Sequence, residues 1–328
     1  MQEPISEPAS AEIVGGIDLG GTKIEAVVSD SEHRVLGSAR HPTPTTGGPA
    51  DVASAMAAAL TEAARAAKLE PAQLRGVGVG SPGRVDTATG TVSRADNLPG
   101  WYASFPLAAA LQSALGTPVT VGNDVSVATD AEFKLGAGRP YRSLIGVFWG
   151  TGIGGGLILD GVPWHGRGGA GEIGHMVIVQ DGRQCTCGRR GCVEAYAGRG
   201  ALEAHARSLH AKGEKTKLFE LAAEHGRDRL TSSIWARALE HGDKLATKLI
   251  DRAVLALGAG IASAVNLLDV EAVIIGGGLG VRFGEPYRER IAEATAPHLF
   301  NDANPPAIAL AGLGDVGGAL GATLLVER

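Results

Sequence analysis

Hydrophobic residues occur in short runs separated by glycine-rich turns, with longer alanine-rich stretches between them. The run at 13–17 ends in DLGGTK and β-type residues resume at 24–29, so we predict two strands joined by a tight turn. The same reasoning predicts further strands at 34–40, 75–80, 118–121, 143–149, 155–159 and 272–275. Helical spacing predicts helices over 50–68, from an N-cap at Ser104 to about Leu115, from Asp124 to about Leu135, within 194–268 and from Asp315 onward.

The strand–turn–strand pattern occurs twice, at 13–29 and at 143–159, and both turns contain Gly-Thr. This weak internal repeat predicts two related halves, joined near 136–140 where proline and glycine gather. We therefore expect a disordered tail over 1–12, an N-terminal α/β domain over 13–135 and a C-terminal α/β domain over 136–314. A terminal helix, 315–328, is expected to pack back on the first domain.

Composition narrows the class of protein. Glycine supplies 49 of the 328 residues, while hydrophobic residues at 44% and charged residues at 20% are typical of a globular chain. Aromatic residues are only 4%, the net charge is −5 and no basic run occurs, which argues against a nucleic-acid or membrane partner. No apolar stretch approaches about 20 residues, and the first residues lack a signal-sequence pattern. The three cysteines do not fit a secreted disulfide framework, so we expect a cytoplasmic protein.

The first glycine turn, from Asp18 to Lys23, has the residues of a phosphate-binding turn. Gly20 and Gly21 would let backbone N–H groups approach an anion, Thr22 adds a hydroxyl and Lys23 a cation. Asp18 carries the hard oxygen ligands that suit Mg²⁺. The alternative is a hairpin whose glycines only supply positive φ, although such a hairpin rarely needs aspartate, threonine and lysine together.

The segment GTGIGGG at 150–156 is a second candidate phosphate loop, with Thr151 and Gly152 near its start. It matches G-x-G-x-x-G, as does the segment 78–83. A dinucleotide-binding unit needs a helix straight after the glycines. We predict a strand after the glycines of 150–156, and no helix after the segment 78–83. A Rossmann enzyme is therefore disfavoured.

Asp124 follows Asn123 between a predicted strand and a predicted helix. An aspartate at a helix start is most often an N-cap. It could also be a general base that accepts the proton of a substrate hydroxyl as that hydroxyl attacks phosphorus.

One histidine and three cysteines form a candidate zinc site: His175, Cys185, Cys187 and Cys192. A Cys₃His set suits tetrahedral structural zinc and leaves no open position for water, so such an ion would organise a loop. Three inert thiols, or a disulfide with a spare thiol, are the alternatives.

Polar residues near these segments could bind a sugar. Glu172 and Glu194 flank the cysteines, and a metal-braced loop could present their carboxylates to hydroxyl groups. The segment NLPGW is either a simple turn or presents the Asn97 amide and an aromatic rim, Trp101, to a polar ligand.

Eight blocks, in family order, resemble the ROK family of sugar kinases, and within it the bacterial glucokinases: IDLGGTK, VGSPG, NLPGW, GND, GTGIGGG, GEIGH, CTCGRRGCVEAY and VIIGGG. The resemblance implies the two-domain actin-like/hexokinase (ribonuclease H-like) α/β fold with a central cleft. It implies ATP-dependent phosphorylation of a hexose at the 6-hydroxyl, most closely glucose, with Mg²⁺ and a structural Zn²⁺. Homodimers or homotetramers are common in the family.

The resemblance also assigns roles to individual residues. Asp124 is similar to the catalytic base. The sugar contacts would be Gly83, Asn97, Asn123, Asp124, Glu172, His175 and Glu194. The ATP phosphates would lie at Thr22, Lys23, Thr151 and Gly152, the adenosine near Gly277 and Gly278, and Mg²⁺ near Asp18. His175 would then place one ring nitrogen on zinc and the other on the sugar.

Departures and related activities leave alternatives open. Gly122 precedes Asn123, and Val125-Ser126-Val127 follows Asp124, where the family commonly has other residues. N-acetylmannosamine, N-acetylglucosamine, fructose or allose could be the substrate, and polyphosphate could be the donor, although the net charge offers no support for it. A sugar sensor without catalysis is an alternative of another class. The short segment before the first strand does not fit the winged helix-turn-helix of ROK repressors.

Overall fold

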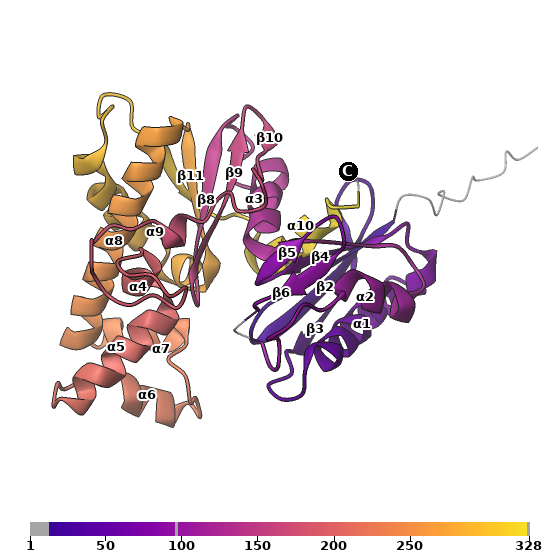
Figure 1. Cartoon of the computed structure of the whole chain (residues 1–328), viewed down its shortest axis with the longest axis horizontal. Coiled ribbons are helices and arrows are strands. Elements are labelled where there is room, and N and C mark those ends of the chain that lie inside the picture. Colours follow the sequence, from indigo (N-terminus) through magenta and orange to yellow (C-terminus); the bar gives the residue numbers. More distant parts are fainter. Residues whose placement is uncertain (1–12, 96–97, 327–328) are drawn as a thin grey trace, which may run out of the picture. The chain divides into compact units, whose positions relative to one another are not determined.

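The computed structural model describes residues 13–95 and 98–326, so the predicted tail 1–12 and Asn97 lie outside the described residues. The chain divides into two compact units (Figure 1). Unit 1 comprises Met1–Ala131 and Leu313–Arg328, and unit 2 comprises Glu132–Gly312. Each unit is described by itself below.

Unit 1 is built on a mixed sheet with the strand order β3-β2-β1-β4-β7. Its strands are β1 (Val14–Leu19), β2 (Lys23–Ser29), β3 (Val35–Pro42), β4 (Val77–Ser81) and β7 (Val119–Asn123), and a separate hairpin pairs β5 (Arg84–Asp86) with β6 (Thr91–Ser93). β1, β2 and β3 form an antiparallel meander, while β4 and β7 run parallel to β1. The helices are α1 (Pro49–Ala66), η2 (Pro71–Gln73), α2 (Leu107–Leu115), η5 (Gly314–Val316) and α10 (Gly317–Thr323), while α3 (Asp124–Leu135) begins in unit 1 and its last residues belong to unit 2.

Helices cover both faces of this sheet, and glycines in β1 set how closely they approach. A Cβ at Gly15 would meet Leu60 of α1, whereas a Cβ at the next residue, Gly16, would clash with the Ala319 carbonyl of α10. Successive strand residues face opposite sides of a sheet. The terminal helix α10 therefore lies directly on the strand backbone, on the face opposite α1.

Unit 2 repeats the same plan, with the strand order β10-β9-β8-β11-β12. Its strands are β8 (Leu144–Trp149), β9 (Ile153–Leu159), β10 (Val162–Pro163), β11 (Ala272–Gly276) and β12 (Ala307–Leu310). The helices are η3 (Ile173–His175), α4 (Glu194–Ala197), α5 (Arg199–Ala211), α6 (Leu218–Glu224), α7 (Ser232–Glu240), α8 (Lys244–Leu268), α9 (Gly277–Thr295) and η4 (Ala296–His298). The two antiparallel hairpins, β1–β2 and β8–β9, occupy equivalent places in the two sheets, which confirms the predicted repeat and the α/β class.

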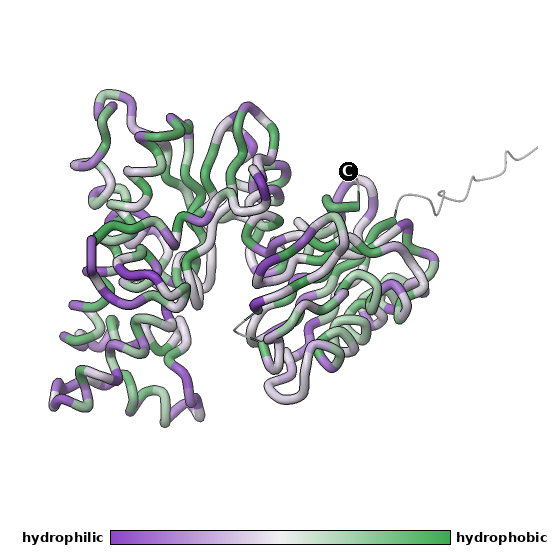
Figure 2. Tube along the Cα trace, viewed as in Figure 1, coloured by the Kyte–Doolittle hydropathy of each residue, from purple (hydrophilic) through white to green (hydrophobic). Residues whose placement is uncertain are grey.

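Figure 2 shows the apolar residues concentrated along the strands of both sheets. One helix, α8, is long and apolar enough to pass a test for a membrane span, and 67% of its most apolar window is buried inside the structure. A core helix passes the same test, and α8 contributes Leu249, Ile250 and Leu257 to the core of unit 2.

Two details of the sequence interpretation are wrong. Ser104 does not cap a helix, because Phe105 pairs with Val92 in a β-bridge and keeps the chain extended until Pro106, so that α2 begins at Leu107. Trp101 forms no aromatic rim: its side chain is 1% exposed, and its indole N–H donates to the Val92 carbonyl. Trp101 is a core residue of unit 1.

Candidate active site

Parallel strands bring the predicted residues of unit 1 to one edge of its sheet. Asp18 on β1 pairs in register with Gly80 on β4, and a Cβ at Gly80 would lie 3.5 Å from the Cα of Asp124. β7 ends at Asn123, in register with Ser81 of β4. The carboxyl ends of β1, β4 and β7 thus gather the two aspartates at one place.

Asn123, and not Asp124, caps helix α3. The Asn123 Oδ1 accepts a hydrogen bond from the Ser126 backbone N–H at 3.2 Å, which is the geometry of an N-cap. Asp124 is the first residue of α3 and is partly exposed, and its Oδ1 accepts a hydrogen bond from the Val125 N–H at 2.9 Å. The helix does not need the Asp124 carboxylate as its cap, which leaves the general-base interpretation standing.

The first glycine turn joins β1 to β2 and is held from outside. Its ends are closed by the Gly20 N–H, which donates to the Lys23 carbonyl at 2.9 Å, and the Thr43 hydroxyl donates to the Gly20 carbonyl at 2.7 Å. Thr43 could not be identified from local sequence, because it follows β3 and lies 23 residues from Gly20 in the chain. Gly21 and Thr22 are exposed and remain accessible to a ligand.

Lys23 is not a free cation. Its Nζ lies 3.3 Å from Glu25 Oε2 and 3.7 Å from Asp315 Oδ1. Arg40 pairs with the same two carboxylates, at 2.6 Å and 3.0 Å. The positive charge beside the first turn is therefore largely balanced within unit 1.

Asp18 has an unusual environment for a carboxylate. Burial raises its pKa from 3.8 to about 6, and the Glu25 charge adds to this while Lys23 opposes it. A carboxylate that is costly to ionise gains more than an exposed one from a nearby cation. Asp18 therefore fits the predicted neighbourhood of Mg²⁺.

Replacing Asp18 by asparagine is expected to stabilise the ligand-free protein above pH 6. The pKa of Asp18 is higher in the folded state than in the unfolded chain, so ionising the buried carboxyl destabilises the folded protein. This destabilisation is absent below pH 3.8 and complete above about pH 6. A shift of two units corresponds to about 3 kcal/mol at most, and residual solvent access reduces it. Urea unfolding of both proteins at pH 4.5 and pH 8 measures the effect. An advantage of Asp18→Asn that does not grow with pH would contradict it.

The second glycine turn joins β8 to β9 in unit 2. The Gly150 N–H donates to the Gly152 carbonyl at 3.0 Å, which closes the turn, and Thr151 is exposed at its tip. Gly277 lies against the end of β8: its φ is +81°, and a Cβ there would be 2.6 Å from the Trp149 carbonyl oxygen. Only glycine fits, and α9 consequently begins beside the turn, with Gly278 close to Gly150.

Glu194 connects this turn to the cysteine loop. One carboxylate oxygen accepts from the Ile153 N–H at 2.9 Å, and the other accepts from the Thr186 hydroxyl at 3.0 Å. Cys185 Sγ lies 3.8 Å from that second oxygen. Glu194 is predicted to contact sugar, and in the structure its carboxylate also fixes the start of β9.

The four predicted metal ligands come together within unit 2. One donor atom from each of His175, Cys185, Cys187 and Cys192 lies within 4.8 Å of the others. The three cysteines are free thiols, so the disulfide alternative is wrong. Burial raises the pKa of the Cys185 thiol to about 12, so a cation is needed to hold it as a thiolate.

Two of the separations between these donor atoms are close to those of a tetrahedral zinc site. Zn–S bonds of about 2.3 Å place two sulfur ligands about 3.8 Å apart, and a sulfur and a nitrogen about 3.6 Å apart. Cys187 Sγ and Cys192 Sγ are 3.8 Å apart, and His175 Nδ1 is 3.7 Å from Cys185 Sγ. The donor set therefore fits zinc in chemistry and in size.

His175 has its two ring nitrogens on different sides. Nδ1 faces the cysteines, while Nε2 lies 3.9 Å from Glu172 Oε2. Glu172 is exposed. The expected contact between Nε2 and a sugar stays a prediction. Gly83, the remaining predicted sugar contact among the described residues, has a φ of +85° between β4 and β5.

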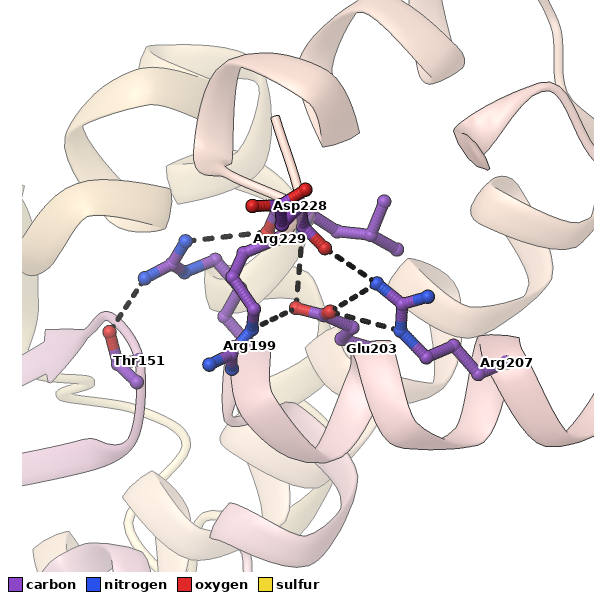
Figure 3. A network of polar contacts seen from close by, with 7 residues as sticks. Thr151, Arg199, Glu203, Arg207, Asp228 and Arg229 are labelled. Atoms are coloured by element: carbon purple, nitrogen blue, oxygen red, sulfur yellow. Dashed lines mark hydrogen bonds and ion pairs between the residues drawn. The ribbon is translucent and has the colours of Figure 1, made fainter. Parts of the chain in front are cut away.

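The residue that sequence reasoning missed in unit 2 is Arg199, the first residue of α5. Its guanidinium donates to the Thr151 hydroxyl at 2.7 Å and to the Leu230 carbonyl at 3.3 Å (Figure 3). No local motif marks an arginine that lies 48 residues from the turn it contacts.

Comparisons with known proteins identify the family of this chain. A family model described as the ROK family matches residues 14–328. The chain is 32% identical over 287 residues to a glucokinase of Thermotoga maritima, covering 86% of this chain and 88% of that protein. It is 32% identical over 327 residues to an N-acetyl-D-glucosamine kinase of Salmonella dublin, covering 94% and 98%. The structure of a ROK family glucokinase from Streptomyces griseus in complex with glucose and AMPPNP is similar, with a TM-score of 0.81 and 33% identity, covering 96% of this chain and 99% of that one.

Proposed function

Because the chain belongs to the ROK family, we propose that it is a sugar kinase that transfers the γ-phosphoryl group of ATP to the 6-hydroxyl of glucose. Its fold is the two-domain actin-like fold of hexokinases, as the family resemblance implied. The relatives that support the activity are sugar phosphotransferases by name.

The observation that carries the proposal is the position of Asp124. Its carboxylate lies at the carboxyl edge of the unit 1 sheet, and Asn123 relieves it of capping α3. In the proposed reaction Asp124 takes the proton of the sugar 6-hydroxyl, the O6–Pγ bond forms, and the bond from Pγ to the β,γ-bridging oxygen breaks to release ADP. The family resemblance assigns further sugar contacts to Asn123, Gly83, Glu172, His175 and Glu194.

The nucleotide is assigned to the two glycine turns. Gly20, Gly21, Thr22 and Lys23 in unit 1 and Thr151 and Gly152 in unit 2 would contact phosphates, and Gly277 and Gly278 would lie near the adenosine. Mg²⁺ neutralises phosphate charge in such reactions, and Asp18 is the residue that would lie near it.

Zinc is proposed at His175, Cys185, Cys187 and Cys192, supported by the donor spacing. Its role there is structural, because all four positions are filled by protein ligands. Holding Nδ1 of His175 fixes the tautomer, so that Nε2 carries the proton toward the sugar.

The sugar is tested by measuring ADP release with Mg-ATP against glucose, mannose, fructose, N-acetylglucosamine and N-acetylmannosamine. We expect glucose to give the highest kcat/KM. A preference for an N-acetyl sugar would keep the mechanism and change the assigned substrate. N-acetylglucosamine is the second candidate, because the chain is similar to the Salmonella enzyme. Sugar binding without turnover on any sugar would refute the kinase proposal. Polyphosphate in place of ATP tests the donor.

We further propose that the protein is cytoplasmic and forms a homodimer or homotetramer, because family membership favours both. Light scattering of the purified protein measures the number of subunits.

A further inference from the structure

The β8–β9 turn is held by the first residues of α5. The Arg199 N–H donates to the Gly150 carbonyl at 3.1 Å, and the Gly200 N–H donates to the Thr151 carbonyl at 2.9 Å. In a planar trans peptide the C=O and the following N–H point in opposite directions. The N–H groups of Thr151 and Gly152 therefore point away from α5, and no hydrogen-bond partner for them occurs among the described residues.

The Arg199 side chain orients the Thr151 hydroxyl on the same turn. Its Nη2 donates to Thr151 Oγ1 at 2.7 Å. A hydroxyl that accepts from a guanidinium keeps its own proton for another acceptor. The exposed Thr151 hydroxyl thus becomes a third donor at the turn, beside the two N–H groups.

Arg199 carries a charge that its surroundings do not neutralise. In the parts of the chain that the structure describes, no carboxylate forms an ion pair with it. The nearby Glu203, which is 5% exposed, is occupied by Arg207 at 2.8 Å, Arg229 at 3.1 Å and the Leu230 N–H at 3.1 Å (Figure 3). Glu203 is therefore paired with two other arginines and forms no ion pair with Arg199. Burial, and then the Arg229 charge, lower the pKa of Arg199, and the Glu203 charge, which raises it, does not offset them.

We propose that Arg199 is a positioning residue that prepares the β8–β9 turn for the nucleotide's phosphates, by orienting the Thr151 hydroxyl and placing an unbalanced positive charge behind it. The inference rests on the proposed kinase function and adds a residue to it. A half-buried guanidinium attracts an anion more strongly than an exposed one, because little solvent screens it. The charge also contrasts with unit 1, where Glu25 and Asp315 balance Lys23.

The test compares Arg199→Met, Arg199→Lys and Thr151→Val with the wild type. We expect Arg199→Met to raise the KM for ATP about tenfold or more, the size of a hydrogen bond to a charged group, while the KM for glucose stays within twofold. Arg199→Lys keeps the charge and loses the planar guanidinium group. Its KM for ATP is expected to lie between those of the wild type and Arg199→Met. In the double variant Arg199→Met/Thr151→Val, the fold-increase in the KM for ATP is expected to be smaller than the product of the two single fold-increases, because both substitutions act through one hydroxyl.

Nucleotide binding gives a second readout that does not need turnover. A fluorescent ATP analogue is expected to bind Arg199→Met about tenfold more weakly. The corresponding AMP analogue should bind as it does to the wild type, because it lacks the β- and γ-phosphates. Equal weakening of both analogues, or no weakening of either, would overturn the proposal in favour of a purely structural role.

Arg207→Met is the matched control, since Arg207 bonds Glu203 and the Asp228 carbonyl and does not reach the turn. It is expected to lower Tm and leave the KM for ATP within twofold. If Arg199→Met does not fold, Arg199→Lys and the exposed Thr151→Val still decide the question. A wild type that binds ATP but phosphorylates no sugar would refute the kinase function while leaving the binding test of Arg199 intact.

Discussion

Replacing Asp124 by asparagine is expected to lower kcat for glucose phosphorylation by roughly 10²–10⁴-fold, the usual contribution of a general base. Asparagine has nearly the same shape and can still accept the hydrogen bond from the Val125 N–H. It cannot accept the proton of the sugar hydroxyl. Helix α3 should be unaffected, because Asn123 provides the cap.

Glucose affinity separates loss of chemistry from loss of the site. Calorimetric titration is expected to give a glucose Kd for Asp124→Asn within a few-fold of the wild type, and Asp124→Ala should behave in the same way. Glu62→Gln, which removes an exposed carboxylate on α1, serves as the control and should leave kcat unchanged. Full turnover in Asp124→Asn with ordinary sugar affinity would remove Asp124 from the role of base.

Most of the fold follows from signals that are local in the sequence. The two glycine turns and the strands around them are predictable, because Gly-Thr turns between β-type runs leave the backbone few other conformations. The repeat at 13–29 and 143–159 predicted two related halves, and the two sheets have equivalent strand orders. Ser104 misled because its capping chemistry is local, whereas the Val92–Phe105 bridge that delays α2 joins residues from separate segments.

In the candidate site, too, local features could be predicted from the sequence and contacts between distant segments could not. Residue types identified the cysteine cluster, and the structure brings all four ligands together. The electrostatics of the turns could not be predicted, since Lys23 is paired with Asp315 and Thr151 with Arg199. These partners lie far apart in the chain and belong to no motif.

The zinc cluster should couple folding to activity. Glu194 connects the cysteine loop to the β8–β9 turn, because its carboxylate accepts hydrogen bonds from Thr186 in the loop and from Ile153 at the start of β9. His175 links the cluster to Glu172 in the same way. Loss of the ion would release the loop and, with it, the groups assigned to sugar and phosphate.

Replacing Cys187 by alanine is therefore expected to lower zinc content, stability and activity together. Three remaining ligands bind zinc far more weakly than four, and zinc-binding free energy contributes directly to folding. We expect bound zinc to fall from one ion per chain to well below one, and Tm to fall by roughly 10 °C. Elemental analysis, thermal unfolding and the coupled kinase assay measure the three quantities.

The control for this prediction is Asp181→Asn, which removes an exposed charge from the same loop at a position of positive φ that asparagine tolerates. It should keep its zinc and its Tm. If the wild type contains no zinc when purified without chelator, the metal interpretation fails. If Cys187→Ala loses zinc but retains full kcat, then Glu194 and His175 hold their positions without the ion, and the cluster serves stability alone.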